Sequence, residues 1–421
     1  MKLLFFVHNF PPEFRGGTEQ VVLGLARSFR DGGDEVVVVS GSERTAPGGR
    51  LVEEVVETGD GRPIRVRRLL RAPEERYGLL LNYPATGERI GAILAEERPD
   101  FVHVHHWSTL GMDLVQRSVA LGIPAGVTLH DPWVTCARFF RRPPRGIRCP
   151  SDATRKACVS CVGMDMEGRP LEDIAAELGE RDAALRRELG LASFVAVPSA
   201  ATAALISRHL PMRREDLDVI PHGLLREPAG RALPREGDVP LRVGSFGNLV
   251  PDKGIDLLVE ALAGLGDQVE LQLAGHCPDP AYRQHLERLA DKLKVPLRWI
   301  GPFGEDDPHP ALDMDIAVFP SLCQETYGLV VEEALAHGVP VVVSQNGALP
   351  ERAARGGVVV RSGGVMPLHI ALSTLLRSRA QLETLRDEIA DPGSFPRIGT
   401  AAGRYRELIQ AAIATADPRP S

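Results

Sequence analysis

Residues 316–343 read IAVFPSLCQETYGLVVEEALAHGVPVVV, and this stretch decides the fold of the chain. Residues 316–319 are a short apolar run of strand length, and the proline and polar residues after them end that strand in a loop. Apolar residues then recur with helical spacing from Gly328 onward, and Gly338 is placed to end that helix. Residues 339–343 resume as a buried strand. A strand, a loop, a helix and a second strand in this order predict an α/β unit with parallel strands.

The start of this helix is a candidate anion-binding site. The N–H groups of a first helical turn have no acceptor within the helix, and the helix dipole adds positive potential there. Residues 328–330 would supply these amides at the carboxyl end of a parallel strand, where α/β sheets bind ligands. Glu325 precedes them and Glu333 lies in the second turn, so two carboxylates could flank one anion and accept hydrogen bonds from sugar hydroxyls. A solvated helix face is the alternative for Glu332 and Glu333, and periodicity does not choose between these two glutamates.

The spacing of Glu325, seven residues and Glu333 resembles the E-x7-E signature of the retaining GT4-type glycosyltransferases. These enzymes have the GT-B fold, an α/β architecture of two Rossmann-like domains whose parallel sheets face each other across a cleft. The resemblance implies that Glu325 contacts the donor sugar, that the amides between the two glutamates hold the diphosphate, and that Glu333 contacts the ribose. Further donor-binding residues implied in this stretch are Tyr327, Gly328, Leu329 and Val330.

Length and composition indicate a two-domain globular protein, with 421 residues, 43% apolar and 25% charged. The formal net charge of −7 argues against a general nucleic-acid-binding protein. The opening MKLLFFVHNFPP has too short an apolar run for a secretory signal, and no run approaches the ~18 apolar residues of a membrane span. We therefore expect a cytoplasmic protein with reduced cysteines, and leave open a peripheral position at the inner membrane face.

An N-terminal, acceptor-binding Rossmann-like domain is expected over residues 1–222. Gly16 and Gly17 open a helix directly after its first strand, in a loop that resembles the glycine loop of GT4 enzymes, whose backbone faces the donor phosphates and the acceptor. A structural β-α loop without a ligand is the alternative. His130 follows a later strand, and the resemblance implies that it hydrogen-bonds the donor sugar near the reacting centre. A strand-end histidine with no special role is the alternative there.

A cysteine-rich insertion is predicted at about residues 132–165. Its cysteines are Cys136, Cys149, Cys158 and Cys161. A C-x-x-C pair with two further cysteines in a cytoplasmic chain favours a closed structural zinc site, because thiolates suit tetrahedral zinc. An iron–sulfur cluster, disulfide bonds and free thiols are the alternatives. Four protein ligands leave no open position, so a catalytic zinc is disfavoured.

Residues 138–156 of the same insertion hold seven basic residues against one acid, Asp152. The basic residues are Arg138, Arg141, Arg142, Arg145, Arg148, Arg155 and Lys156. Solvated surface is one interpretation. The other is an electropositive flap that receives an anionic acceptor or touches an anionic membrane surface.

The second half begins after a linker predicted at residues 223–240. Residues 241–395 are expected to form the nucleotide-sugar-binding domain, and a helix within residues 396–421 is implied by the resemblance to cross back onto the first domain. Lys253 precedes a helix, where a cation could reach the diphosphate. The family pattern G-R-L-x-x-x-K-G places an arginine where this chain has Asn248. Because asparagine supplies hydrogen bonds without charge, the chain has either an adapted donor site or an inefficient one.

The resemblance implies transfer, with retention, from a UDP- or GDP-linked sugar to an unidentified acceptor that could be anionic, and we expect this transfer to be metal-independent. The resemblance implies His130, Glu325 and Lys253 as catalytic residues, with the leaving diphosphate stabilised by Lys253 and helix amides and with no cofactor for catalysis. Phe303 is implied to meet the nucleotide base.

Two other readings of the function stay open. A sugar-nucleotide epimerase or phosphorylase could use the same fold. The chain could also be a non-catalytic, zinc-containing binding module whose donor site has degraded, as Asn248 suggests. The oligomeric state is not legible in the sequence.

Overall fold

The computed structural model of the protein describes residues 1–57, 61–144, 149, 154–235, 237, 239–389 and 391–416. The chain forms two compact units. The first contains Met1–Phe139, Pro150–Leu225 and Arg397–Ser421, and the second contains Phe140–Cys149 and Arg226–Pro396. The change from the first unit to the second at residues 225 and 226 falls inside the predicted linker, 223–240.

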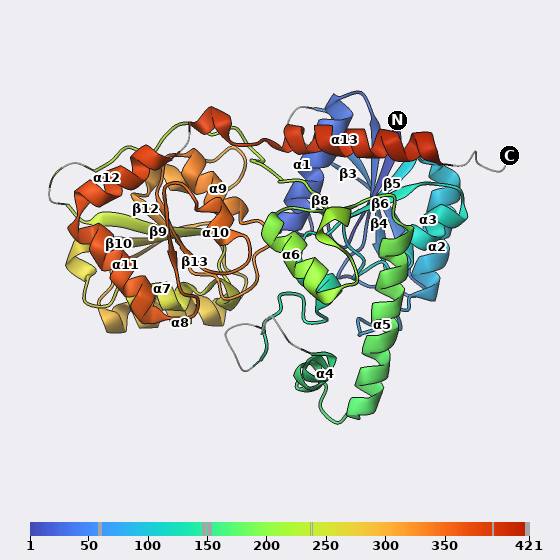
Figure 1. The fold of residues 1–421 in the computed structure, drawn as a ribbon, viewed down its shortest axis with the longest axis horizontal. Coiled ribbons are helices and arrows are strands. Elements are labelled where there is room, and N and C mark those ends of the chain that lie inside the picture. Colours follow the sequence, from blue (N-terminus) through green and yellow to red (C-terminus); the bar gives the residue numbers. More distant parts are fainter. Residues whose placement is uncertain are drawn as a thin grey trace. The chain divides into compact units, whose positions relative to one another are not determined.

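The described part of the first unit (Figure 1) is built on an eight-stranded sheet. Its strand order is β3-β4-β2-β1-β5-β6-β7-β8. Neighbouring strands run parallel, apart from the edge pair β3 and β4, which is antiparallel. The strands are β1 (Lys2–Val7), β2 (Glu35–Ser40), β3 (Arg50–Val56), β4 (Ile64–Leu70), β5 (Phe101–Val104), β6 (Ala125–Thr128), β7 (Val195–Val197) and β8 (Asp218–Val219). Most central strands are buried along their length, which explains their continuous apolar runs.

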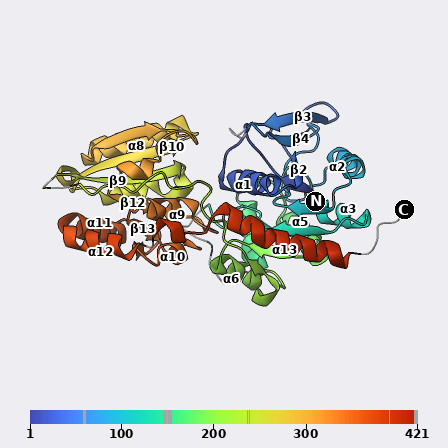
Figure 2. The ribbon, with the colours of Figure 1, turned by 90° about the horizontal axis from the view of Figure 1, so that it is seen from above.

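Except for the last one, the helices of this unit connect its parallel strands, as crossover connections require. They are α1 (Gly17–Asp31), α2 (Pro84–Glu97), α3 (Leu114–Ala120), α4 (Arg155–Gly163), α5 (Leu171–Leu191), α6 (Ala200–His209) and α13 (Ile398–Thr415). The last of these, α13, lies along α1 (Figure 2). A Cβ at Gly24 of α1 would come 3.0 Å from Ile398 Cγ1, so the two helices approach closely there. The Arg406 guanidinium lies 5.2 Å from the centroid of the Phe29 ring in the same interface.

The second unit has a six-stranded sheet within its described residues, with the order β11-β10-β9-β12-β13-β14 and all neighbours parallel. The strands are β9 (Leu241–Asn248), β10 (Val269–His276), β11 (Leu297–Gly301), β12 (Ile316–Phe319), β13 (Val341–Ser344) and β14 (Gly357–Val360). The helices are α7 (Ile255–Ala261), α8 (Pro280–Leu293), α9 (Leu329–Ala336), α10 (Leu349–Arg352), α11 (Val365–Arg377) and α12 (Arg379–Glu388). The predicted class, an α/β chain with two parallel-sheet domains, is confirmed.

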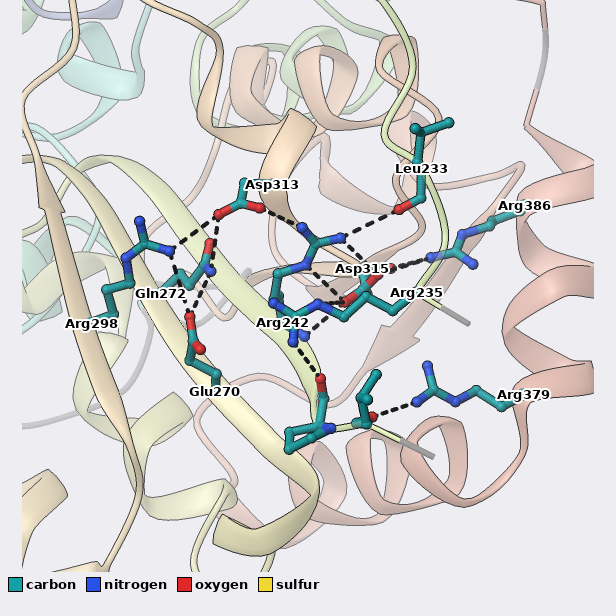
Figure 3. A network of polar contacts seen from close by, with 12 residues as sticks. Leu233, Arg235, Arg242, Glu270, Gln272, Arg298, Asp313, Asp315, Arg379 and Arg386 are labelled. Atoms are coloured by element: carbon teal, nitrogen blue, oxygen red, sulfur yellow. Dashed lines mark hydrogen bonds and ion pairs between the residues drawn. The ribbon is translucent and has the colours of Figure 1, made fainter. Parts of the chain in front are cut away.

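An ion-pair network closes the amino-terminal edge of the second sheet (Figure 3). Asp315 is fully buried just before β12 and accepts hydrogen bonds from the Arg242 backbone N at 2.8 Å and from Arg242 Nε at 3.1 Å. Arg386 of α12 lies 3.6 Å from the same carboxylate. Asp313 also pairs with Arg242. Asp313 and Asp315 therefore join β9, β12 and α12.

The residues before α5 differ in part from expectation. The sequence shows little regular pattern around the C-x-x-C pair, yet Cys158 and Cys161 lie on α4, which Thr154 caps by accepting a hydrogen bond from Ala157 N. Residues 145–148 and 150–153, which include Arg145, Arg148 and Asp152, lie outside the described residues. Within the described residues, no helix is long and apolar enough to cross a membrane.

Candidate functional site

The candidate donor site of the second unit centres on Glu325, in the loop between β12 and α9. Its Oε1 accepts hydrogen bonds from Lys253 Nζ at 2.6 Å and from Ser321 Oγ at 2.7 Å. Burial raises the pKa of Glu325, but the Lys253 charge and these hydrogen bonds outweigh burial and hold the pKa below its ordinary value. Burial lowers the pKa of Lys253, and the Glu325 charge raises it by more. Both groups are therefore charged at neutral pH.

Two glycines bring neighbouring loops onto this pair. Gly254 follows Lys253 with φ +68°, and a Cβ there would overlap the carbonyl oxygen of Pro320. Gly347 has φ +57°, and a Cβ there would overlap the carbonyl oxygen of Glu325. That oxygen accepts a hydrogen bond from Ala348 N at 2.8 Å. Only glycine permits both the positive φ and the close approach, so the backbone sets the positions of Lys253 and Glu325.

The helix α9 starts as the sequence predicts, directly after the Glu325 loop. Gly328 is its N-cap with φ 89° and ψ 55°, a left-handed conformation that glycine adopts without strain. The amides of Leu329 and Val330 open the first turn, where N–H groups lack intrahelical acceptors. A Cβ at Gly247 would come 3.1 Å from Val330 Cγ1, so the end of β9 packs against this first turn. Asn248 follows Gly247 as the last residue of β9 and is exposed.

Tertiary contacts distinguish the two glutamates that periodicity could not separate. Glu332 is buried and accepts a hydrogen bond from the Tyr327 hydroxyl at 2.7 Å, and Arg352 lies 3.5 Å from its carboxylate. Glu333 is more exposed, and its Oε2 lies 3.7 Å from His309 Nε2. Glu333 is therefore the glutamate available to a ligand. Tyr327 is buried with its hydroxyl committed to Glu332, which leaves its backbone as the group that could contact a donor.

An aromatic cluster surrounds Glu333. Phe303 makes an edge contact with His309, whose ring centroid is 5.6 Å away, and His309 stacks on His337 at 4.3 Å. His337 Nδ1 lies 2.8 Å from the carbonyl oxygen of Glu333. This places Phe303, the residue implied to meet the base, in the same cluster as the carboxylate implied to meet the ribose.

The first unit holds the second group of candidate residues. Gly16 is the N-cap of α1 and Gly17 its first residue. A Cβ at Gly16 would come 2.6 Å from Glu19 Oε2, so a side chain there would displace this buried carboxyl. Glu19 Oε1 lies 3.1 Å from His8 Nε2. Burial raises the pKa of Glu19 to about 7, against the hydrogen bonds from the backbone of Glu19 and Gly16 that lower it.

His130 lies in a chain of buried histidines after β6. Its Nε2 is 2.9 Å from His105 Nδ1, and its ring stacks on His222 with 5.0 Å between centroids. Burial lowers the pKa of His130 well below its ordinary value, and the nearby His222 lowers it further. His130 is therefore neutral at pH 7 and can exchange hydrogen bonds with a sugar, but it cannot supply a cation. His103 is fully buried, and its Nε2 lies 2.8 Å from Thr128 Oγ1.

The four cysteines of the insertion are divided between the two compact units. Cys136, Cys158 and Cys161 belong to the first unit, whereas Cys149 belongs to the second. Over the described residues, no group of three or more His, Cys, Asp or Glu side chains could hold a metal ion, and none of the cysteines forms a disulfide bond. Structural zinc therefore stays a prediction from the spacing of the four cysteines.

Acidic neighbours compensate much of the positive charge predicted for the insertion. Arg138 pairs with Asp165, Arg142 with Asp252 and Arg155 with Asp182. These acids lie outside the arginine-rich run itself. The sequence of the run alone therefore does not give the net charge of this surface. The three ion pairs reduce the positive potential that would attract an anionic surface.

Several residues of these sites were not expected from the sequence. Three of them belong to no sequence motif and come to the site only through tertiary contacts: Ser321, His309 and Arg352. Glu19 had a local signal, since it directly follows the glycine loop in the helix-opening run Gly16-Gly17-Thr18-Glu19. His8 had none beyond its place at the end of the first strand.

Two family models match the chain. One, described as Glycosyltransferase Family 4, covers residues 15–224. The other, described as Glycosyl transferases group 1, covers residues 240–378. The two matched ranges together span most of the sequence and include nearly every candidate residue described above.

Two curated relatives are similar over much of their length. The MMP alpha-(1->4)-mannosyltransferase of Mycolicibacterium hassiacum is 28% identical over 71% of this chain and 67% of its own. The phosphatidyl-myo-inositol mannosyltransferase of Mycolicibacterium smegmatis is 25% identical over 93% of this chain and 86% of its own.

Solved structures show the same architecture. Sucrose-phosphate synthase from Thermosynechococcus elongatus aligns over 99% of this chain and 100% of its own, with a TM-score of 0.69 and 20% identity. HepE from Anabaena in complex with UDP-glucose aligns over 98% of this chain and 100% of its own, with a TM-score of 0.65 and 18% identity. At these identities the likeness shows the fold alone, and the predicted GT-B fold is confirmed.

Proposed function

Because this chain is a glycosyltransferase with a family 4 domain followed by a group 1 domain, we propose that it moves a sugar from a nucleoside-diphosphate donor to an acceptor hydroxyl with retention. The observation that carries this proposal is the Lys253–Glu325 pair at 2.6 Å, because the loop that holds Glu325 leads into the first turn of α9. A cation, free helix amides and a fixed carboxylate are the groups that a sugar diphosphate needs.

The roles of these groups follow from their charges. The Lys253 ammonium and the amides of Leu329 and Val330 stabilise the negative charge that grows on the diphosphate as the bond from the anomeric carbon to the phosphate oxygen breaks. Glu325 accepts hydrogen bonds from the donor sugar and holds Lys253 in place. The new bond forms between the anomeric carbon and the acceptor oxygen, and the acceptor proton passes to the departing phosphate oxygen. No metal ion takes part in this scheme.

The other candidate residues assist binding. His130 is neutral and suits a hydrogen bond to a sugar hydroxyl. Glu333 accepts from the ribose, and Phe303 meets the base beside it. For the backbone at Gly16 and Gly17 we propose, from the family resemblance, a role in binding the donor phosphates and the acceptor. Asn248 contributes an uncharged hydrogen bond where the family pattern has arginine, so charge at the diphosphate rests more heavily on Lys253.

Mannose is the sugar we propose, because both curated relatives are named as mannosyltransferases. The nucleotide of the donor is GDP or UDP, and the screen described next distinguishes them. The acceptor carries a hydroxyl on a sugar or cyclitol and could also carry an anionic group.

The first experiment is a thermal-shift screen of the full-length protein with GDP-mannose, UDP-glucose, GDP and UDP, followed by a nucleotide-release assay with candidate acceptors. We expect stabilisation by GDP-mannose and release that depends on an acceptor. Glu325→Ala should abolish transfer with the fold intact. The matched control is Glu287→Ala, which removes a carboxylate paired with Arg283 at 3.0 Å on α8. Near-normal turnover of Glu325→Ala would refute the site, and nucleotide release without any acceptor would favour an epimerase.

A further inference from the structure

A cavity in the first unit has no role in the scheme above. Its volume is about 440 Å³, and its lining residues are Pro12, Glu13, Arg44, Glu54, Val55 and Arg68. Small-molecule sites commonly enclose about 300–1,000 Å³, so this volume suits one sugar-sized ligand with some water. The lining residues come from the loop after β1, the loop after β2 and the edge pair β3–β4. The first two loops follow the carboxyl ends of parallel strands, where α/β sheets bind ligands.

Four charged side chains in the wall of this cavity are linked in a closed ring of ion pairs with alternating sign, which we call the Arg–Glu ring. Glu13 Oε2 lies 3.3 Å from Arg68 Nη1, and Glu13 Oε1 lies 3.2 Å from Arg44 Nε. Glu54 Oε2 lies 2.8 Å from Arg68 Nε, and Glu54 Oε1 lies 3.8 Å from Arg44 Nη2. Each guanidinium therefore faces two carboxylates, and each carboxylate faces two guanidinium groups.

One side of the ring is rigid and the other is open. Arg68 is 1% exposed and also donates hydrogen bonds to the carbonyl oxygens of Phe10 and Pro11, at 3.2 and 3.0 Å. Arg44 is 59% exposed, and its Nη1 can donate to a ligand. Arg68 thus holds the loop after β1 against β4 as a floor, while Arg44 forms the rim.

The charge balance of the ring selects the chemistry of its ligand. An added anion would meet two carboxylates as well as two guanidinium groups, so its net electrostatic gain is small. A neutral polyol gains from both, because hydroxyls donate to carboxylates and accept from guanidinium groups. We propose that the Arg–Glu ring binds a neutral polyhydroxylated ring, a hexose or cyclitol, that forms part of the acceptor. This rests on the proposed function, and it places any anionic group of the acceptor outside the ring.

The test uses the full-length protein and three probes: methyl α-D-mannopyranoside, myo-inositol and inorganic phosphate. Saturation-transfer NMR and calorimetry should show binding of the two neutral polyols in preference to phosphate. Arg44→Ala and Glu54→Gln should each weaken polyol binding about tenfold, the effect of losing a hydrogen bond to a charged group. The matched control is Arg62→Ala, because Arg62 is 57% exposed in the same unit and pairs with Asp31 at 3.0 Å away from the cavity. This control should bind polyols as the wild type does.

Three results would overturn the inference: preferential binding of phosphate, no detectable binding of either polyol, or ring variants with unchanged polyol affinity. The last result would leave the ring as a network that only ties the loop after β1 to β3 and β4. The wild-type comparison of neutral and anionic probes needs no variant, so it stands even if a variant is unstable. Binding of GDP-mannose and UDP-glucose to the same samples separates the two proposals, since a protein that binds polyol but no nucleotide sugar refutes the proposed function alone.

Discussion

Replacing Lys253 by methionine isolates the contribution of the cation that pairs with Glu325. Methionine keeps much of the side-chain volume but removes the charge, so Glu325 keeps its burial and loses the partner that offsets burial. The pair is only partly shielded, because the Lys253 side chain is 37% exposed and the Glu325 side chain 17%. Breaking a fully buried pair costs about 3–5 kcal/mol, and solvent screening of an exposed pair reduces this, so we expect a loss of about 1–2 kcal/mol in unfolding free energy.

The activity should fall by more than the stability. Lys253 faces the charge that develops on the leaving diphosphate, and removing one such preorganised donor lowers kcat by about 10²–10³-fold. The pH profile should change as well. With Lys253 present, the pKa of Glu325 lies below its ordinary value, whereas burial alone raises it. The acidic limb of the rate profile should therefore move to higher pH in Lys253→Met.

The pH dependence of stability follows from the same shifts. A carboxyl group whose pKa is lowered on folding stabilises the fold above its unfolded pKa, and this contribution is lost as pH falls through the folded pKa. Lys253, whose pKa is raised on folding, stabilises below its unfolded value and loses this contribution at high pH. The wild type should lose stability at both extremes, and Lys253→Met should lose less on acidification.

The assays are nucleotide release with a saturating donor and urea unfolding across pH. The control is Lys292→Met on α8, which should match the wild type in both. The reasoning is refuted if Lys253→Met turns over at the wild-type rate with an unshifted acidic limb.

Three further predictions concern stability and metal content. Asp315→Ala removes the buried carboxylate that pairs with the Arg242 guanidinium, so urea unfolding should show a loss of about 3–5 kcal/mol in unfolding free energy. Wild-type stability of this variant would contradict the role of the network. Glu19 has a pKa raised from 4.5 to about 7, so it stabilises the fold fully below pH 4.5 and progressively less up to pH 7. In Glu19→Gln, where the side chain still faces His8, the fall in unfolding free energy between pH 4.5 and pH 7 should be smaller by about 3 kcal/mol. An unchanged slope of unfolding free energy against pH would argue against a buried carboxyl at Glu19. Native mass spectrometry should find about one zinc per chain if the four thiolates close around a metal, and a zinc-free protein of full stability would retire that prediction.

Much of the fold was readable in the sequence because its strands are buried on both faces. Residues 316–319 were predicted as a strand from an unbroken apolar run, and the structure has β12 with the same limits. The edge pair β3–β4 was not predicted, because its strands mix apolar and charged residues, and charged side chains such as Arg67 and Arg68 are buried there by ion pairing. Residue patterns do not anticipate such pairing between distant positions.

The chain's order of residues alone determined the α/β class, the helix start at Gly328 and the spacing of Glu325 and Glu333, because turn chemistry and hydrophobic period are local properties. Tertiary structure decided which carboxylate is buried and which is available, since Glu332 meets Tyr327 and Arg352 whereas Glu333 turns toward His309. It also brought Lys253 onto Glu325 and closed the Arg–Glu ring. These outcomes depend on contacts between residues far apart in the chain, and burial and charge pairing act only after the fold has brought those residues together.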